Sequence, residues 1–175
     1  MAGVGKTFSG GETVKLTPRE LQAVADALPE HGLAVVVGTS QGTVARFWSQ
    51  QRPTLSFLCV DNYRDGEPVD NVAAWMKNRT ANMQLFVGTL GDLARIAGFH
   101  KAAVVVIAPN SGGCARLLAH AFGLVQPGGM ICCGGYEEGN PATDGIAREV
   151  NEFCAERKLQ VHHVTERMAF IPCEI

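Results

Sequence analysis

Two short apolar runs limit most strongly what this chain can fold into. Leu33–Val37 lies between two glycines, and Ala102–Ala108 is the longest unbroken apolar run in the sequence. Both runs are rich in valine, which is typical of strands that are buried on both faces, as in parallel sheets. Ala102–Ala108 is also far shorter than the roughly 18 residues that a membrane-spanning helix needs. We therefore expect a buried parallel sheet and no membrane partner.

Helical patterns alternate with strand patterns along the whole chain. The order begins at Thr17-Pro18-Arg19-Glu20, which has the residues of a capping box at the start of a helix. Three more apolar runs and a closing hairpin are predicted strands: Leu55–Val60, Gln84–Val87, Met130–Cys133, Leu159–Val164 and Arg167–Ile171. A helix is predicted after each strand that precedes the hairpin. This order predicts an α/β fold, Rossmann-like and doubly wound, with a mostly parallel seven-stranded sheet and a C-terminal antiparallel hairpin.

The chain of 175 residues has the length of one domain. Residues 1–16 are rich in glycine and have no clear period, so we expect a flexible N-terminus and a single domain over residues 17–175. Gly3-Val4-Gly5-Lys6-Thr7 matches the end of a phosphate-binding loop. The strand and the earlier glycine that such a loop requires are missing, so a flexible terminus is the preferred interpretation.

Composition and cysteine usage exclude several classes of protein. Apolar residues make up 46% and charged residues 18%, which excludes a disordered chain. There are 15 basic and 17 acidic residues and no Lys/Arg run longer than two, so no nucleic-acid partner is expected. The six cysteines stand mostly in apolar runs without a C-x-x-C pair, which favours reduced thiols in a cytoplasmic protein over disulfides or zinc.

A glycine turn and a carboxylate form the strongest candidate site. Ligands of such sheets bind at the carboxyl ends of the strands, where the strand order reverses. Gly38 and Gly42 allow the chain to turn tightly after the first strand, and Asp61 ends the second strand, where it can accept hydrogen bonds from ribose hydroxyls. Each feature alone has a plain structural interpretation, as a turn or as a loop carboxylate. Together they indicate a cofactor that carries a nucleoside.

The sequence around this turn resembles a known family. Val35–Thr43 is similar to the first motif of class I S-adenosylmethionine-dependent methyltransferases, and it does not match the dinucleotide pattern G-x-G-x-x-G. Leu124–Ile131 resembles the family's "L-x-P-G-G" turn into strand five, and the closing hairpin is also typical of that fold. Ala74–Asn78 and Gly145–Val150 are similar to segments of the small, lidless relatives of sugar and macrolide O-methyltransferases.

The resemblance implies a cofactor, S-adenosylmethionine, and a reaction, methyl transfer to a small-molecule acceptor. The residues that it assigns to the cofactor fall into three groups, for the methionine half, the ribose and the adenine: Gly38, Thr39, Ser40 and Gly42; Asp61 and Asn62; and Thr89 and Leu90. For Thr89, a role as the N-cap of the next helix is an equal alternative.

Departures from the family pattern leave the chemistry open. Val36 stands where the family usually has an acidic residue. The turns Ala108-Pro109-Asn110 and Gly134-Gly135-Tyr136 lack the aspartates of metal-dependent relatives, so we expect no metal site. Asn110, Tyr136 and Glu137 are weak candidates for a catalytic base, because a residue of this kind after a strand more often serves as a turn or solvated residue.

Two alternatives to the enzyme remain from the sequence. A catalytically degenerate protein that keeps the fold for binding or structure would explain Val36 and the turns without carboxylates. An enzyme that uses a nicotinamide cofactor is a weaker alternative. The family resemblance implies no inserted lid, so a homo-oligomer in which a partner subunit closes the site is as compatible with the sequence as a monomer.

Overall fold

The computed structural model describes residues 16–63, 68–96, 99, 101–108, 114–136, 144–165 and 167–174. Their helices are α1 (Pro18–Ala27), α2 (Thr43–Gln51), α3 (Pro68–Asn78), α4 (Leu90–Leu93), α5 (Cys114–Leu124) and α6 (Asp144–Arg157). Their strands are β1 (Gly32–Val37), β2 (Leu55–Asp61), β3 (Met83–Val87), β4 (Ala102–Ile107), β5 (Val125–Gly134), β6 (His162–Thr165) and β7 (Met168–Cys173).

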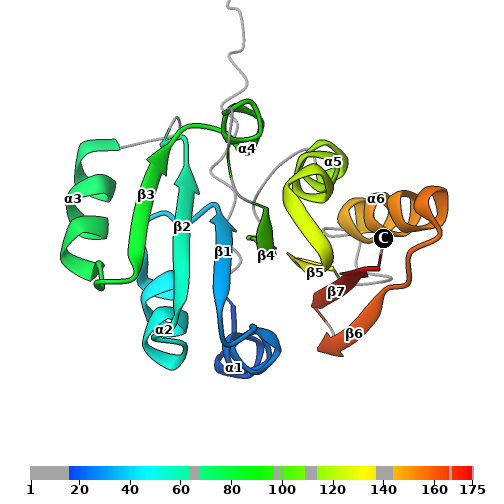
Figure 1. The fold of residues 1–175 in the computed structure, drawn as a ribbon, viewed down its shortest axis with the longest axis horizontal. Coiled ribbons are helices and arrows are strands. Elements are labelled where there is room, and N and C mark those ends of the chain that lie inside the picture. Colours follow the sequence, from blue (N-terminus) through cyan, green and yellow to red (C-terminus); the bar gives the residue numbers. More distant parts are fainter. Residues whose placement is uncertain are drawn as a thin grey trace, which may run out of the picture.

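The strands of these residues form one sheet in the order β3-β2-β1-β4-β5-β7-β6 (Figure 1). The first five in this order run parallel to one another, whereas β7 is antiparallel to both β5 and β6. This arrangement confirms the predicted Rossmann-like α/β class and the closing hairpin. The strand order reverses between β1 and β4, so the topological switch point lies at the carboxyl end of β1.

Helices cover both faces of the sheet, and each face has its own apolar core. Along β1, Ala34 and Val36 pack with residues of α1, α2 and α3, whereas Val35 and Val37 pack with residues of α4, α5 and α6. Successive side chains of a strand point to opposite faces, so a strand that is apolar at every position can supply both cores. The burial of both faces explains why the valine-rich runs in the sequence are apolar at every position.

The N-terminal helix begins as the sequence predicts. The Thr17 side chain accepts a hydrogen bond from the Glu20 backbone N–H, and the Glu20 carboxylate accepts one from the Thr17 N–H at 2.6 Å. The Glu20 carboxylate is buried and forms an ion pair with Arg167 at 3.6 Å. Arg167 precedes β7, so this pair joins the first helix to the closing hairpin. Of the predicted flexible segment 1–16, only Leu16 is described, and its side chain packs against the core.

Several elements differ from their predicted bounds, among them β6, which begins at His162 rather than Leu159. The helix expected from Leu90 to Ile96 ends at Leu93, and Ile96 is exposed. Strand β5 begins at Val125 rather than Met130, because the predicted Pro127–Gly129 turn lies within the strand as an irregularity of its register with β4. Gly128 has a φ of +74°, which glycine adopts without steric cost and which lets the chain turn there.

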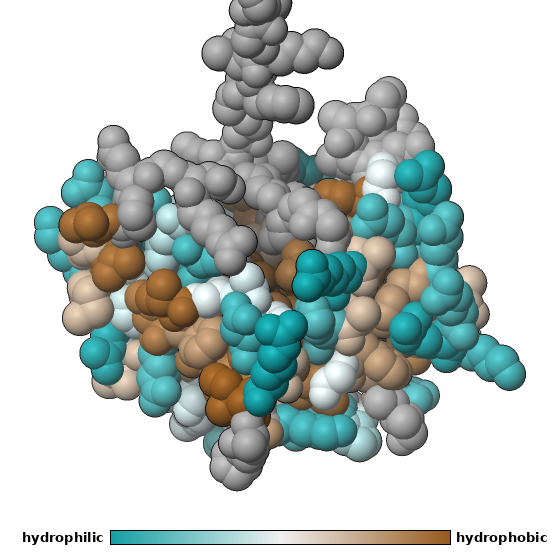
Figure 2. All heavy atoms as spheres, turned by 90° about the horizontal axis from the view of Figure 1, so that it is seen from above, coloured by the Kyte–Doolittle hydropathy of each residue, from teal (hydrophilic) through white to brown (hydrophobic). Residues whose placement is uncertain are grey.

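Strand β3 forms one edge of the sheet and carries exposed apolar side chains. Figure 2 views the molecule from above and shows brown apolar groups on the side of α3 and β3, where the exposed large residues are Val69, Met76 and Val87.

Among the described helices, none combines the length and the apolar character that crossing a membrane would require.

Candidate functional site

The glycine turn after β1 lies at the switch point of the sheet. Gly38, Ser40 and Gly42 have positive φ angles of 76°, 46° and 78°. The Gly42 N–H donates to the Thr39 carbonyl at 2.8 Å, and Gly42 is the N-cap residue of α2. Three left-handed residues at alternate positions turn the chain sharply from the strand into the helix. Glycine meets this demand at two of them, whereas Ser40 needs other support.

The carboxylate at the end of β2 contacts this turn directly. Asp61 Oδ2 accepts a hydrogen bond from the Ser40 N–H at 2.7 Å, and Oδ1 accepts one from the Tyr63 N–H at 3.0 Å. A carboxylate has about four acceptor positions, so two remain for ribose hydroxyls. Asp61 is only half-buried, which leaves these positions accessible. The two sequence features that indicated a nucleoside therefore lie side by side.

Helix α3 supports the same turn from the opposite direction. The Asn78 side-chain amide donates to the Gln41 carbonyl at 2.9 Å. The Gln41 amide donates in turn to Asn71 Oδ1 at 3.4 Å. The turn is therefore held between the end of β2 and the exposed face of α3, and its shape is determined before any ligand arrives.

Position 42 requires glycine because of contacts within the protein itself. A Cβ at Gly42 would lie 2.6 Å from Cδ1 of Trp75, a residue of α3 that is almost fully buried. The positive φ adds backbone strain for any other residue. Packing against Trp75 and the turn geometry therefore require this glycine within the protein itself.

The two residues expected beside the adenine have structural roles. Thr89 is the N-cap of α4: its hydroxyl accepts from the Asp92 N–H, and its own N–H donates to the Asp92 carboxylate. Leu90 is buried in the core, so its side chain cannot edge a ligand. The Gly88 N–H donates to the Asp61 carbonyl at 3.0 Å, so the end of β3 stays next to the end of β2. Backbone groups near Thr89 remain candidates for adenine contacts.

One candidate base faces away from the site. Tyr136 is 1% exposed, and its hydroxyl donates to Asn151 Oδ1 of α6 at 3.0 Å. Its ring belongs to the core beneath α5 and α6. As a candidate base, Tyr136 was expected on the ligand side of the sheet. The structure instead places its side chain in the core. Asn110 and Glu137, the other two candidates, lie outside the described residues.

Tyr63 is a site residue that the sequence did not reveal. Tyr63 follows the end of β2, yet it is only 8% exposed and its hydroxyl donates to the Ser40 carbonyl at 2.9 Å. Burial and the negative charge of Asp61 raise the pKa of Tyr63 to about 12. No local pattern in the sequence indicates this contact, because Ser40 and Tyr63 are 23 residues apart in the chain.

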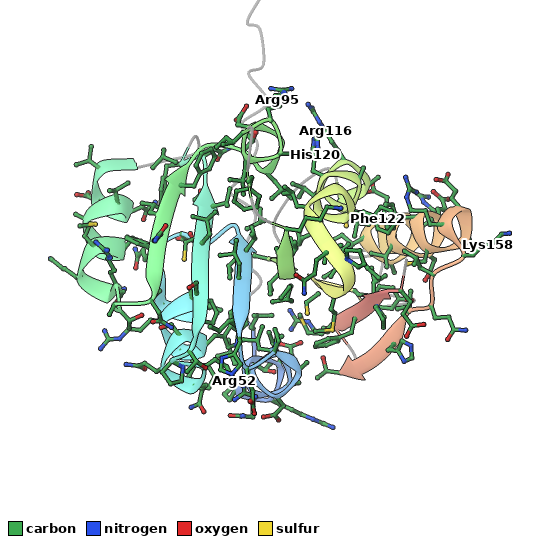
Figure 3. All side chains as sticks on the ribbon, viewed as in Figure 1. Arg52, Arg95, Arg116, His120, Phe122 and Lys158 are labelled. Carbon is green, nitrogen blue, oxygen red and sulfur yellow. The ribbon has the colours of Figure 1, made fainter. Side chains whose placement is uncertain are left out.

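Basic side chains lie at the same end of the sheet. Figure 3 shows Arg95 beside α4, and Arg116 and His120 on α5. Arg95 forms an exposed ion pair with Asp92 at 3.4 Å. Arg52 lies at the opposite end of the strands, where β1 and β2 begin. It lines a hollow of about 370 Å³ whose lining also includes His31 and Thr54. That hollow is open and far from the switch point. No group of three potential metal ligands occurs among the residues described.

Comparison with known proteins supports the fold. No family model and no curated protein matches the sequence. The SAH-bound methyltransferase PaMTH1 of Podospora anserina aligns with a TM-score of 0.64 and 14% identity, over 89% of this chain and 76% of that one. The precorrin-6y C5,15-methyltransferase of Geobacter metallireducens aligns with a TM-score of 0.63 and 14% identity, over 87% and 84%.

A larger protein of the same fold is also similar to this chain. The O-methyltransferase family 2 protein of Planctomyces limnophilus, solved in complex with apigenin, aligns with a TM-score of 0.59 and 14% identity. The alignment covers 86% of this chain but only 56% of that one, so the chain spans about half the length of that enzyme. The chain has the fold of the class I S-adenosylmethionine-dependent methyltransferases.

Proposed function

We propose that the protein binds S-adenosylmethionine and transfers its methyl group to a small-molecule acceptor. The observation that carries this proposal is the contact between Asp61 and the glycine turn at the switch point of a methyltransferase-type sheet. A turn that exposes backbone groups next to a carboxylate with free acceptor positions fits a ligand with a ribose and a charged amino-acid half. The SAH-bound structure of a protein with the same fold supports the same ligand.

The residues present fit this cofactor by their chemistry. We assign the ribose to Asp61 and Asn62, and the methionine half to the turn formed by Gly38, Thr39, Ser40, Gln41 and Gly42. The cofactor supplies a methyl group on a sulfonium sulfur, which is already a good leaving group. The protein's part is then to hold the methyl group in line with the acceptor atom, because orientation alone can supply a large share of the rate.

We further propose that the transfer needs no metal ion. Ala108-Pro109-Asn110 and Gly134-Gly135-Tyr136 offer no pair of carboxylates to a hard cation. A hydroxyl acceptor would need a base, and Glu137 remains a candidate for it because it follows β5. Asn110, which follows β4, could only hydrogen-bond the acceptor, since an amide does not take up its proton. With magnesium removed by EDTA, methyl transfer should continue at an unchanged rate. Loss of activity that magnesium restores would contradict metal independence.

Calorimetric titration tests the proposed cofactor. S-adenosylmethionine and S-adenosylhomocysteine should each bind with one site per chain, and NAD should not. Binding of NAD alone would favour a nicotinamide enzyme. Binding of both sulfur nucleosides, without methyl transfer to any hydroxyl or amine in a panel of small acceptors, would favour the catalytically degenerate alternative. A chain that binds none of the three ligands would contradict the proposal.

A further inference from the structure

The turn after β1 contains a conformation that its sequence does not favour. Ser40 has a φ of 46°, between two glycines that also have positive φ. A residue with a Cβ adopts this left-handed region at a steric cost, because its Cβ crowds the backbone. Such a conformation persists only where surrounding contacts hold it, and it is common at ligand sites.

Both backbone groups of Ser40 are held by residues at the end of β2. Its N–H donates to Asp61 Oδ2 at 2.7 Å, and its carbonyl accepts from the Tyr63 hydroxyl at 2.9 Å. Asp61 also accepts from the Tyr63 N–H at 3.0 Å, so the three residues form one closed set of hydrogen bonds. Tyr63 itself has a φ of 46° and is buried, which leaves its ring little freedom.

We propose that Tyr63 is a positioning residue of the cofactor site, whose hydroxyl holds Ser40 in the left-handed conformation and thereby keeps the glycine turn in its binding shape. The hydrogen bond itself is a property of the free protein, whereas its importance for binding rests on the proposed function. The distinction from Asp61 is chemical. The carboxylate can contact the ligand, whereas the phenol acts through the backbone of the turn.

The donor role of Tyr63 should persist across a wide range of pH. Burial and the neighbouring carboxylate raise the pKa of Tyr63 to about 12, so the phenol keeps its proton in neutral and mildly alkaline solution. The charged group that faces it is Asp61, and the buried thiol of Cys59 lies nearby. A neutral phenol can donate to the Ser40 carbonyl, which a phenolate could not do.

Hydrogen exchange in the free protein tests the contact without any ligand. In Tyr63→Phe, Ser40 should leave the left-handed region and lose its bond to Asp61, so its N–H should exchange at least about fivefold faster than in the wild type. Tyr136→Phe is the matched control, because it removes the other tyrosine hydroxyl of the chain from a site in the core. The Ser40 N–H should exchange at the wild-type rate in that variant. Equal exchange in Tyr63→Phe and the wild type would overturn the proposal.

A double-mutant cycle tests the consequence for binding. Tyr63→Phe should weaken S-adenosylhomocysteine about tenfold, the equivalent of one net hydrogen bond. Ser40→Gly provides the second background of the cycle, and its own affinity is the reference there, because Ser40 belongs to the binding turn. Glycine adopts positive φ without help. In the Ser40→Gly background, Tyr63→Phe should therefore weaken binding by less than about threefold, since the two changes act on one conformation.

The outcomes separate this proposal from the proposed function. If the wild type binds no S-adenosylhomocysteine, the cofactor assignment fails, and the exchange rates alone decide whether Tyr63 holds the turn. If the wild type binds and Tyr63→Phe binds equally well, the positioning role is refuted. The role is refuted as well if Tyr63→Phe weakens binding by the same factor in the Ser40→Gly background as in the wild type. Ser40→Gly alone also tests the strain: a melting temperature at or above that of the wild type supports it, and a clear decrease contradicts it.

Discussion

At the scale of single residues, the candidate site joins structural and binding roles at the same positions. Asp61 accepts hydrogen bonds from Ser40 and Tyr63 before any ligand is present. Gly42 is required by its φ of 78° and by the indole of Trp75. Replacing such residues therefore changes the turn as well as any contact to the cofactor, and stability must be measured together with affinity.

Asp61→Ala should weaken the binding of S-adenosylmethionine by about 1–3 kcal/mol, the usual cost of losing a partly buried hydrogen-bond partner. Calorimetric titration measures this loss directly. Asp26→Ala is the control, because Asp26 is exposed on α1, where its carboxylate accepts from the Gln22 side chain. An unchanged affinity in Asp61→Ala would remove this carboxylate from the site.

Gly42→Ala should lower the free energy of unfolding by about 1–3 kcal/mol, because the added Cβ is strained at positive φ and overlaps Trp75. Gly123 in α5 is a matched control, since nothing lies within 4 Å of a Cβ built there. Gly123→Ala should leave stability unchanged or raise it by less than about 1 kcal/mol, because Gly123 lies in the last turn of α5. Urea denaturation measures both variants. Equal stability of Gly42→Ala and the wild type would show that the turn tolerates a side chain.

At the scale of elements, the alternation of strands and helices was predictable and the detailed contacts were not. Valine-rich runs such as that of β4 predict buried strands, because no other short element buries every side chain. The end of α4 could not be read from the sequence, since the pattern of Leu90, Leu93 and Ile96 continues beyond it. The role of Tyr63 depends on a contact over 23 residues of chain, which local patterns do not contain.

The ion pair between α1 and the hairpin gives a test at this scale. Arg167→Met should destabilise the protein by about 1–3 kcal/mol, because it leaves the buried Glu20 carboxylate without its cation. Arg95→Met removes an ion pair with Asp92 in which both side chains are exposed, and its effect should be within about 0.5 kcal/mol. Thermal and urea unfolding of the two variants would check the difference. Similar small effects would show that the hairpin does not depend on Glu20.

At the scale of the whole molecule, the buried thiols connect stability to pH. All six cysteines are free and buried, as the sequence predicts for a reduced protein. Burial raises the pKa of Cys59 and of Cys173 to about 11, and it also raises that of Cys132. The folded state therefore holds these protons more tightly than the unfolded chain, in which thiols ionise near pH 8.5.

The sign of the effect follows from this difference. These protonated thiols stabilise the folded state fully below about pH 8.5. This stabilisation is lost as the pH rises toward 11. The free energy of unfolding in urea should therefore be lower at pH 10 than at pH 8. Cys59→Ala, which removes one such group, should show a smaller decrease between the two pH values than the wild type. Stability that is constant or higher at pH 10 would contradict this account.

The central claim is that a sulfur nucleoside binds at the carboxyl ends of β1 and β2. Titration of the isotope-labelled protein with S-adenosylhomocysteine, followed by backbone NMR, tests this claim most directly. The account predicts saturable shifts that concentrate at Gly38–Gly42, Asp61–Tyr63 and Gly88–Thr89. Saturation without shifts at these residues, or shifts confined to the opposite edge around His31 and Arg52, would contradict it.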